Sequence, residues 1–142
     1  KFDELTAMEM YEIARSRFEV FAMEQKIIQE PELDGVDKEC YQVFCMDNGR
    51  VIAYCRIVPA GIAYDNISLG RVLVLNDYRR KGLAQIMIKE ALKFIKEELK
   101  EDTVVLSGQV YAKGLYESVG FKAISDVYDE VHIPHVKMKI EL

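Results

Sequence analysis

The spacing of hydrophobic residues divides the chain into strands and helices. Short apolar runs predict buried strands at 41–46, 51–58, 67–75 and 103–107, and an alternating run predicts a last strand at 136–142. The first two runs are apolar on both faces, which is typical of a sheet covered on two sides. Residues 82–100 carry an apolar stripe at helical spacing. The pattern predicts an α/β (α+β) fold.

A further helix is expected to begin at Thr6, because Thr6 and Glu9 have the spacing of a capping box. Residues 2–5 before it alternate as a short edge strand would. The expected apolar face comprises Met10, Tyr11, Ala14, Phe18 and Phe21. Arg17 falls inside this face. It is expected either to reach a carboxylate or helix-end carbonyls in a structural role or to contact a substrate, and the structural role is favoured.

Residues 26–39 predict a long loop, since they contain Pro31, Gly35 and five acidic side chains without periodicity. Asp34 in this loop is either a turn-capping residue or part of an acidic rim that receives an amine. After strand 103–107, residues 109–119 predict a helix that ends at Gly120. Residues 121–124 then predict a short strand, and 126–130 an acidic turn.

The dipeptide Asn48-Gly49 predicts a two-residue hairpin between the first two strands. In that register Cys45 and Cys55 point to opposite faces of the sheet, so a disulfide between them is not expected. With Cys40 they form an odd set without C-x-x-C spacing, which gives no zinc or redox motif. We expect three thiols in a reducing compartment and no bound metal.

Composition narrows the class of protein. A chain of 142 residues is expected to form one domain, 1–142. The net charge of −5 argues against a nucleic-acid partner, because phosphate backbones require a basic face. No apolar run approaches the ~18–20 residues that cross a bilayer, so no membrane partner is expected. The first residues lack the pattern of a secretory signal, and we expect a cytoplasmic protein.

One basic cluster stands out in this acidic chain. Arg79, Arg80, Lys81 and Gly82 lie between a strand and a helix, where unpaired main-chain N–H groups and the helix dipole attract phosphate. A solvated basic loop is the alternative. A nucleotide-binding domain is disfavoured, because the chain contains neither G-x-x-x-x-G-K-[ST] nor G-x-G-x-x-G.

Two motifs carry a resemblance to a known family. Arg79-x-x-Gly82-x-Ala84 after a hydrophobic strand resembles the acyl-CoA pyrophosphate loop of the GCN5-related N-acetyltransferases (GNAT). About thirty residues later, Gln109-x-x-Ala112-x-x-Leu115-Tyr116-Glu117-x-x-Gly120-Phe121 resembles the second signature of that family, with Gln109 in place of the usual Asn.

Further segments resemble the ElaA-like branch in the same order along the chain. They are Arg17-x-x-Val20-Phe21-x-x-Glu24-Gln25, Glu32-Leu33-Asp34-Gly35-x-Asp37, Gly70-Arg71-Val72 and Ile133-Pro134-His135-x-x-Met138. The chain departs from that branch at Gln42, where His is frequent, and at Val131-His132, where Asp-Gly is expected. These departures weaken any transfer of substrate preference.

The resemblance implies a GNAT fold, with a mixed, mainly antiparallel sheet of six to seven strands, helices on both faces and a splayed parallel strand pair. It implies acetyl-CoA as cosubstrate in the splay. Its contacts are expected from the main chain of Val72, Leu73 and Val74, from the loop and helix start formed by Arg79, Arg80, Lys81, Gly82, Leu83 and Ala84, and from Gln109. A free N–H, expected at Val74, would polarise the thioester carbonyl.

The implied reaction is direct attack of a primary amine, from a small molecule or a peptide, on the thioester. Tyr116 is the expected acid on the departing thiolate, with a core tyrosine as the alternative. Candidate substrate-side residues are Arg17, Glu24, Asp34, Arg71 and His135. The general base stays open among His135, the carboxylates of Glu24 and Asp34, and a water chain. A lapsed acyl-CoA-binding module is the alternative function, and a homodimer is compatible with the family.

Overall fold

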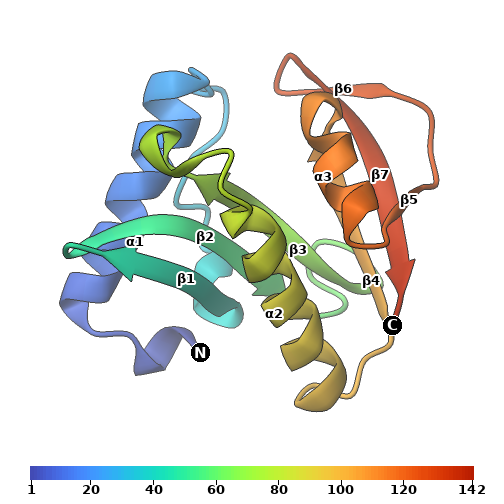
Figure 1. Cartoon of the computed structure of the whole chain (residues 1–142), viewed down its shortest axis with the longest axis horizontal. Helices are drawn as coiled ribbons and strands as arrows, with labels where there is room; N and C mark the ends of the chain where they lie inside the picture. The colour runs from blue at the N-terminus through green and yellow to red at the C-terminus, as the bar shows by residue number, and fades with distance from the viewer.

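The computed structural model describes all residues, 1–142, and contains a seven-stranded sheet of order β1-β2-β3-β4-β7-β5, with β6 paired to β7 (Figure 1). The strands are β1 Tyr41–Asp47, β2 Arg50–Val58, β3 Ile67–Val74, β4 Thr103–Gln109, β5 Lys122–Ala123, β6 Tyr128–Glu130 and β7 Ile133–Glu141. The α-helices are α1 Ala7–Arg17, α2 Leu83–Glu97 and α3 Lys113–Ser118. A π-helical segment, Phe18–Glu24, continues α1, and short 3₁₀ turns cover Phe2–Glu4, Val36–Glu39, Asn76–Tyr78 and Val110–Ala112.

The only parallel pair in the sheet, β3 and β4, opens into a gap. The two strands pair at Ile67 with Val104 and at Ser68 with Val105, and nowhere beyond. Figure 1 shows β3 and β4 diverging from that point, with β1 to β3 on one side of the gap and β4 to β7 with α3 on the other. All other strand pairs are antiparallel. This confirms the predicted mixed sheet with a splayed parallel pair.

Helices cover both faces of the sheet, as its apolar strands predict. In Figure 1, α2 and α3 lie in front of the sheet and α1 lies behind it. The front core includes Cys55, Leu69, Ile88, Ile95, Leu106, Tyr116 and Met138. The rear core is smaller and includes Ile13, Val20, Phe21, Tyr54 and Leu73. The predicted α2 stripe is confirmed, since Met87, Ile88, Ala91 and Ile95 are buried.

The N-terminal predictions were partly wrong. The capping box of Thr6 and Glu9 is present, but residues 2–4 form a 3₁₀ turn and no strand. The buried side of α1 and its continuation contains Glu12, Ile13, Ser16, Arg17, Val20 and Phe21, whereas Tyr11 is 65% and Phe18 is 44% exposed. The helix thus buries a different face from the one predicted, because two polar residues on that face have buried partners. The Ser16 hydroxyl donates to the Val51 carbonyl at 2.5 Å, and Arg17 enters a buried ion network.

The hairpin at Asn48-Gly49 is confirmed, with Asp47 opposite Arg50. The predicted cysteine faces were wrong, because a bulge shifts the register between Cys45 and Met46. Val43 therefore lies opposite Cys55, and Cys45, two residues along β1, shares the face of Cys55. All three cysteines are nonetheless free thiols, as predicted.

Two C-terminal predictions were also incomplete. The acidic turn expected at 126–130 contains strand β6, which pairs with β7, and β7 begins at Ile133 instead of residue 136. The turn between them consists of Val131 and His132, with φ of 48° and 62°. A β-branched valine disfavours this left-handed backbone, and Val-His is not one of the Asn-Gly or Asp-Gly pairs that mark two-residue turns, so the sequence carried no hairpin signal. The helix expected at 109–119 is a 3₁₀ turn followed by the short α3.

Candidate active site

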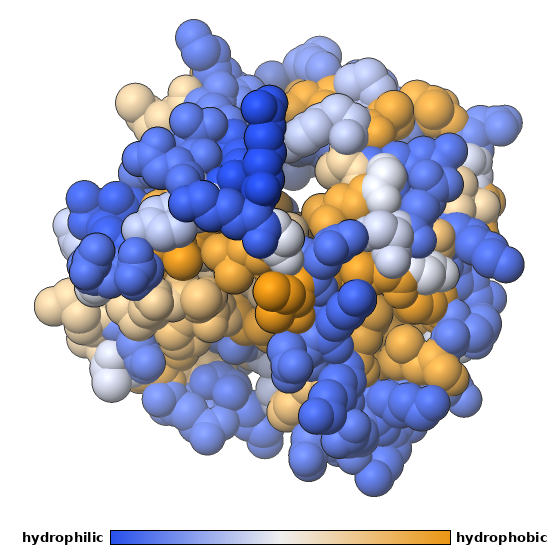
Figure 2. Space-filling model, in the orientation of Figure 1, coloured by the Kyte–Doolittle hydropathy of each residue, from blue (hydrophilic) through white to orange (hydrophobic).

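A cavity of about 260 Å³ occupies the gap between β3 and β4. Among the predicted site residues it is lined by Arg71, Val72, Gln109, Tyr116 and His135. Figure 2 shows an opening on this face of the molecule, with strongly hydrophilic side chains on one side and mixed side chains on the other. The splay of the parallel pair thus brings residues from β3, β4, α3 and β7 to one site.

Tyr116 lies at the cavity wall with its ring packed on the main chain of β4. A Cβ atom on Gly108 would lie 3.0 Å from Tyr116 Cε2, so glycine at this position permits the close approach. The ring also contacts Phe121 edge-on at 6.1 Å between centroids. Burial raises the pKa of the Tyr116 hydroxyl, with a smaller contribution from Cys55, and no hydrogen bond to another protein group engages it. The phenol stays protonated at neutral pH.

A bulge in β3 shapes the opposite wall. Gly70 pairs with Arg56 and Leu73 pairs with Tyr54, so Arg71 and Val72 together oppose the single residue Cys55. Arg71 adopts a left-handed φ of 53° within the bulge. A bulge interrupts the ladder and bends the strand. The β3 main chain is therefore displaced next to the gap, at the segment where the sequence predicted cosubstrate contacts.

The loop before α2 presents unpaired main-chain donors. The first intrahelical bond joins the Ile86 N–H to the Gly82 carbonyl, and no side chain caps the helix, so the N–H groups of Leu83, Ala84 and Gln85 have no acceptor. Gly82 is the N-cap with φ 75°, and Arg80 also has a left-handed φ of 65°. This arrangement is suited to an anion.

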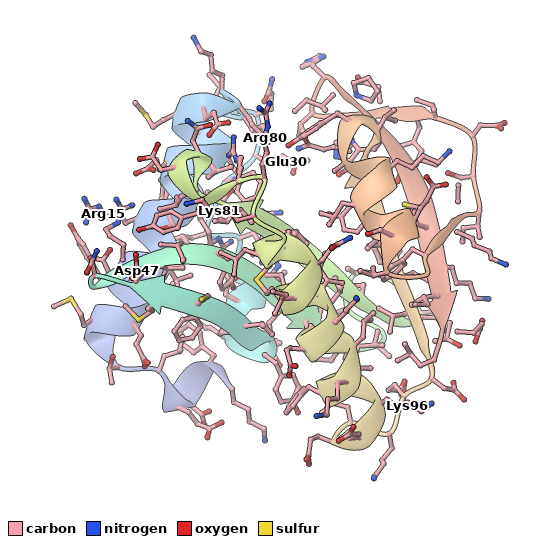
Figure 3. All side chains as sticks on the ribbon, in the orientation of Figure 1. Arg15, Glu30, Asp47, Arg80, Lys81 and Lys96 are labelled. Atoms are coloured by element: carbon pink, nitrogen blue, oxygen red, sulfur yellow. The ribbon has the colours of Figure 1, made fainter.

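The three cations of the loop differ in their surroundings. Arg79 is engaged: its Nε donates to the Val74 carbonyl at 2.8 Å, and its terminal nitrogens bind both Glu24 carboxylate oxygens at 2.6 and 2.9 Å. Figure 3 shows Arg80 at the mouth of the gap, with Lys81 turned toward the α1 side, where its Nζ lies 5.6 Å from the Tyr78 ring centroid. Residues 79–84 do not line the cavity itself. Arg80 and Lys81 are exposed.

A buried network of three arginines and three carboxylates fixes the 26–39 loop against the sheet. Arg17, fully buried, donates to Glu32 at 2.7 Å and to Asp37 at 2.6 Å. Arg56 binds Asp34 and Asp37 at 2.8 and 3.0 Å. Arg71 binds Glu32 at 2.9 Å and Asp34 at 3.4 Å. Breaking a buried pair of this kind costs ~3–5 kcal/mol, so the loop is firmly attached.

The charges in this network stabilise one another. Burial alone would lower the pKa of the Arg17 guanidinium, but the hydrogen bond to Asp37 and the nearby carboxylates raise it. Burial alone would raise the pKa of Asp34, but the hydrogen bond and charge of Arg56 lower it, with help from Arg71. Arg17 and Asp34, predicted as substrate-side candidates, are thus engaged with protein partners and do not line the cavity, and neither does Glu24.

A polar cluster closes the other side of the cavity. His135 is 5% exposed, and its Nδ1 lies 2.7 Å from the Ile133 carbonyl oxygen. Its Nε2 lies 3.5 Å from Glu130 Oε2. The Ser107 hydroxyl donates to Glu130 Oε1 at 3.2 Å and lies 2.5 Å from the Tyr128 hydroxyl. His135, Ser107 and Glu130 all line the cavity.

Sequence reasoning missed several cavity residues. They are Glu30, Arg56, Tyr64, Ser107, Tyr111 and Glu130. Arg56 and Ser107 lie within apolar strands, where a single polar residue gives little signal. Glu30 belongs to the acidic loop that the sequence did single out, and Glu130 was assigned to a turn. The described residues contain no group of three or more His, Cys, Asp or Glu side chains arranged to hold a metal ion. None of the helices has the length and apolar character needed to span a bilayer.

Comparison with known proteins shows close similarity over nearly the whole chain. The family model of the acetyltransferase (GNAT) domain matches residues 8–142. UPF0039 protein C11D3.02c of Schizosaccharomyces pombe is 41% identical over 99% of this chain and 93% of its own. An acyl-CoA N-acyltransferase from Pseudomonas aeruginosa superposes with TM-score 0.88 at 30% identity, covering 98% of this chain and 94% of that one. Escherichia coli ElaA superposes with TM-score 0.89 at 26% identity, covering 99% and 95%.

Proposed function

The chain belongs to the GNAT acetyltransferase family, in its ElaA-like branch, and we propose that it transfers an acetyl group from acetyl-CoA to a primary amine. The observation that carries the proposal is the buried Tyr116, whose unpartnered hydroxyl lies at a cavity between two splayed strands. Acetyl-CoA supplies the activated acyl group. The chain supplies binding, orientation and proton transfer.

The residues around the gap fit the cosubstrate. We assign the diphosphate to the free N–H groups of Leu83, Ala84 and Gln85, with Arg80 and Lys81 as counter-charges. Gly82 and Ala84 keep the loop free of bulky side chains. Arg79 mainly anchors this loop, because it binds Glu24 and the carbonyl at the end of β3. It can contact a phosphate only when its ion pair with Glu24 is broken.

The pantetheine arm is assigned to the main chain of Val72, Leu73 and Val74, alongside the bulge. The side chain of Leu73 packs in the rear core, so Leu73 contributes through its backbone alone. The Val74 N–H is assigned to the thioester oxygen, which gains charge as the amine attacks. Gln109 is assigned to the cavity wall that faces the pantetheine arm from β4. Its side-chain amide is held by two hydrogen bonds with the amide of Gln25, at 2.9 and 3.4 Å.

Tyr116 then protonates the sulfur of the departing thiolate, so that the step does not reverse. Its raised pKa keeps the phenol protonated at neutral pH, so that it holds a proton to donate when the thiolate departs. General acid catalysis of this kind contributes ~10²–10⁴-fold to rate. The packing of the ring on Gly108 fixes the direction of the hydroxyl, whereas a tyrosine on the surface would rotate freely.

Charge around the cavity favours a cationic acceptor. The arginines that line it, Arg56 and Arg71, belong to the network in which three arginines are balanced by three carboxylates of the loop. Glu30 forms no ion pair, and Glu130 contacts only Ser107 and His135. The uncompensated charge at the cavity is therefore negative, which attracts an ammonium group. Arg17 and Asp34 serve the acceptor indirectly, by holding the loop that carries Glu30.

The test is release of free thiol when the protein is mixed with acetyl-CoA and a panel of amines: linear monoamines and diamines, amino-acid amides and short peptides. We expect turnover with at least one class. Y116F should lower kcat by ~10²-fold or more with little change in acetyl-CoA affinity, and Y11F, on the exposed face of α1, should match the parent. Equal turnover by Y116F excludes the acid role. Tight CoA binding without turnover on the whole panel would support an acyl-CoA-binding module instead.

A further inference from the structure

We propose that His135 is the base that accepts the proton of the incoming ammonium, with Glu130 as the carboxylate that pairs with the resulting imidazolium. The inference rests on the proposed acetyl transfer and assigns the group that this transfer leaves open. An alkylammonium must lose a proton before its nitrogen attacks a thioester. Among the side chains that line the cavity, His135 is the only imidazole.

The hydrogen bonds around His135 fix the tautomer that a base requires. A carbonyl oxygen can only accept, so the 2.7 Å contact with Ile133 places the ring proton on Nδ1. The neutral ring then has its lone pair on Nε2. Glu130 Oε2 lies 3.5 Å from Nε2, and the Tyr128 ring stacks on the imidazole at 6.3 Å and 24°. The ring is therefore held in place, and its free nitrogen faces the carboxylate at the cavity.

The position of His135 relative to Tyr116 supports the same assignment. Side chains alternate along β4, so Gly108, which packs under Tyr116, points to the front face, and Ser107 and Gln109 point to the rear. His135 lies opposite Gln109 in the β4–β7 ladder and shares its rear face. Base and acid thus lie on opposite faces of the sheet, and the β3–β4 gap connects them.

This arrangement matches the geometry of direct transfer. An amine that approaches from the rear gives one proton to His135 Nε2, its nitrogen forms the C–N bond, and the C–S bond breaks toward the front. Tyr116 gives its proton to sulfur, and the second proton that nitrogen loses as the amide forms restores the phenol. His135 passes its proton to solvent beside Glu130, whose side chain is 45% exposed. The products are the acetylated amine, free thiol and one proton.

Ser107 and Tyr128 position the carboxylate. Because Ser107 donates to Glu130, the Tyr128 hydroxyl donates to Ser107, which forms a chain of two hydrogen bonds ending on Oε1. Oε2 is left to face the imidazole. The Glu130 carboxylate held in this way is the negative group that faces the imidazolium formed during turnover.

Two measurements test the assignment. Long-range ¹H–¹⁵N NMR of the free protein reports imidazole tautomers, and the chain has only two histidines, so the exposed His132 serves as an internal reference. We expect His135 as the Nδ1–H tautomer. The opposite tautomer overturns the base assignment without bearing on acetyl transfer.

The second measurement is steady-state turnover of acetyl-CoA with the best amine of the panel. H135N keeps a donor for the Ile133 carbonyl but removes the base, so kcat should fall by ~10²-fold with acetyl-CoA affinity unchanged. E130Q should lower kcat by about tenfold and E130D should restore part of it. H132N should match the parent. Parental kcat in H135N overturns the inference alone, whereas a parent protein inactive on every amine overturns both proposals.

Discussion

Replacing Gly108 with alanine tests whether the position of the Tyr116 ring controls the reaction. Gly108 is an ordinary strand residue in β4, so alanine fits its backbone, but the new methyl group would meet the tyrosine. It would lie 3.0 Å from Tyr116 Cε2, 3.1 Å from Tyr116 Cδ2 and 3.1 Å from Leu106 Cδ1. Carbon atoms in contact prefer ~3.5–4.0 Å. The ring must therefore move by about half an ångström.

The size of the effect follows from that displacement. A misplacement of ~1 Å in a catalytic group costs ~10²-fold in rate, so half of it should lower kcat by about tenfold. Overpacking of this kind also destabilises a core by ~1–3 kcal/mol, offset in part by the ~0.5–1 kcal/mol that alanine gains over glycine in a strand. G108A should remain folded and bind acetyl-CoA as the parent does.

The assay is thiol release under saturating acetyl-CoA, with thermal unfolding measured in parallel. G114A is the matched control: it lies in α3 with Tyr116, an added Cβ there meets nothing within 4 Å, and helix propensity predicts a gain of up to ~1 kcal/mol with unchanged kcat. In the Y116F background, G108A should cost little further rate, because both changes act on one group. Additive losses, or parental kcat in G108A, would refute the reasoning.

Three further predictions concern stability. First, Val131 and His132 adopt left-handed backbone in the β6–β7 turn at ~1–2 kcal/mol each, so V131N/H132G should raise the free energy of unfolding by about 2 kcal/mol; no gain in urea unfolding would contradict the strain. Second, burial raises the pKa of the Cys55 thiol to about 12, so the unfolded chain ionises first and stability should fall as pH rises from 9 toward 12. The loss at pH 11 is about 3 kcal/mol, and the Tm of C55A should fall less steeply above pH 9 than that of the parent. Third, burial tends to raise the pKa of Asp34, but the hydrogen bond and charge of Arg56 outweigh burial and lower it, so the stabilisation from this ion pair is present above pH 4 and lost as pH falls below that value. After allowance for solvent screening it amounts to about 1 kcal/mol, and D34N should unfold less steeply in acid; an unchanged acid limb would contradict the ion pair.

The sequence was most informative where local chemistry determines local structure. The strand before the basic loop, Gly82 at the helix start and the short helix carrying Tyr116 all follow from turn residues and apolar periodicity. Both signatures of the family lie in these segments, and the splayed strand pair they imply is present. The contact between Gly108 and Tyr116 joins two of these segments and has no separate signal in the pattern.

The features that sequence could not give depend on partners distant in the chain. Arg17 falls on an expected apolar face, yet its partners Glu32 and Asp37 lie in a loop without periodicity. The pairing of His135 with Glu130 requires the β6–β7 hairpin, whose turn residues are unusual for the left-handed backbone they adopt. Polar residues can lie on buried faces when a tertiary partner exists, and hydrophobic patterns do not report that partner.

The central claim is that the cosubstrate lies along β3 with its diphosphate on the start of α2. Amide-resolved hydrogen exchange measures this directly, because the N–H groups of Leu83, Ala84 and Gln85 have no acceptor in the protein and should exchange rapidly. Adding acetyl-CoA should slow exchange at these three amides and at Val74. AMP, which lacks the pantetheine arm, is the control and should leave the exchange rate at Val74 unchanged. Acetyl-CoA binding that leaves all four rates unaltered would contradict the account.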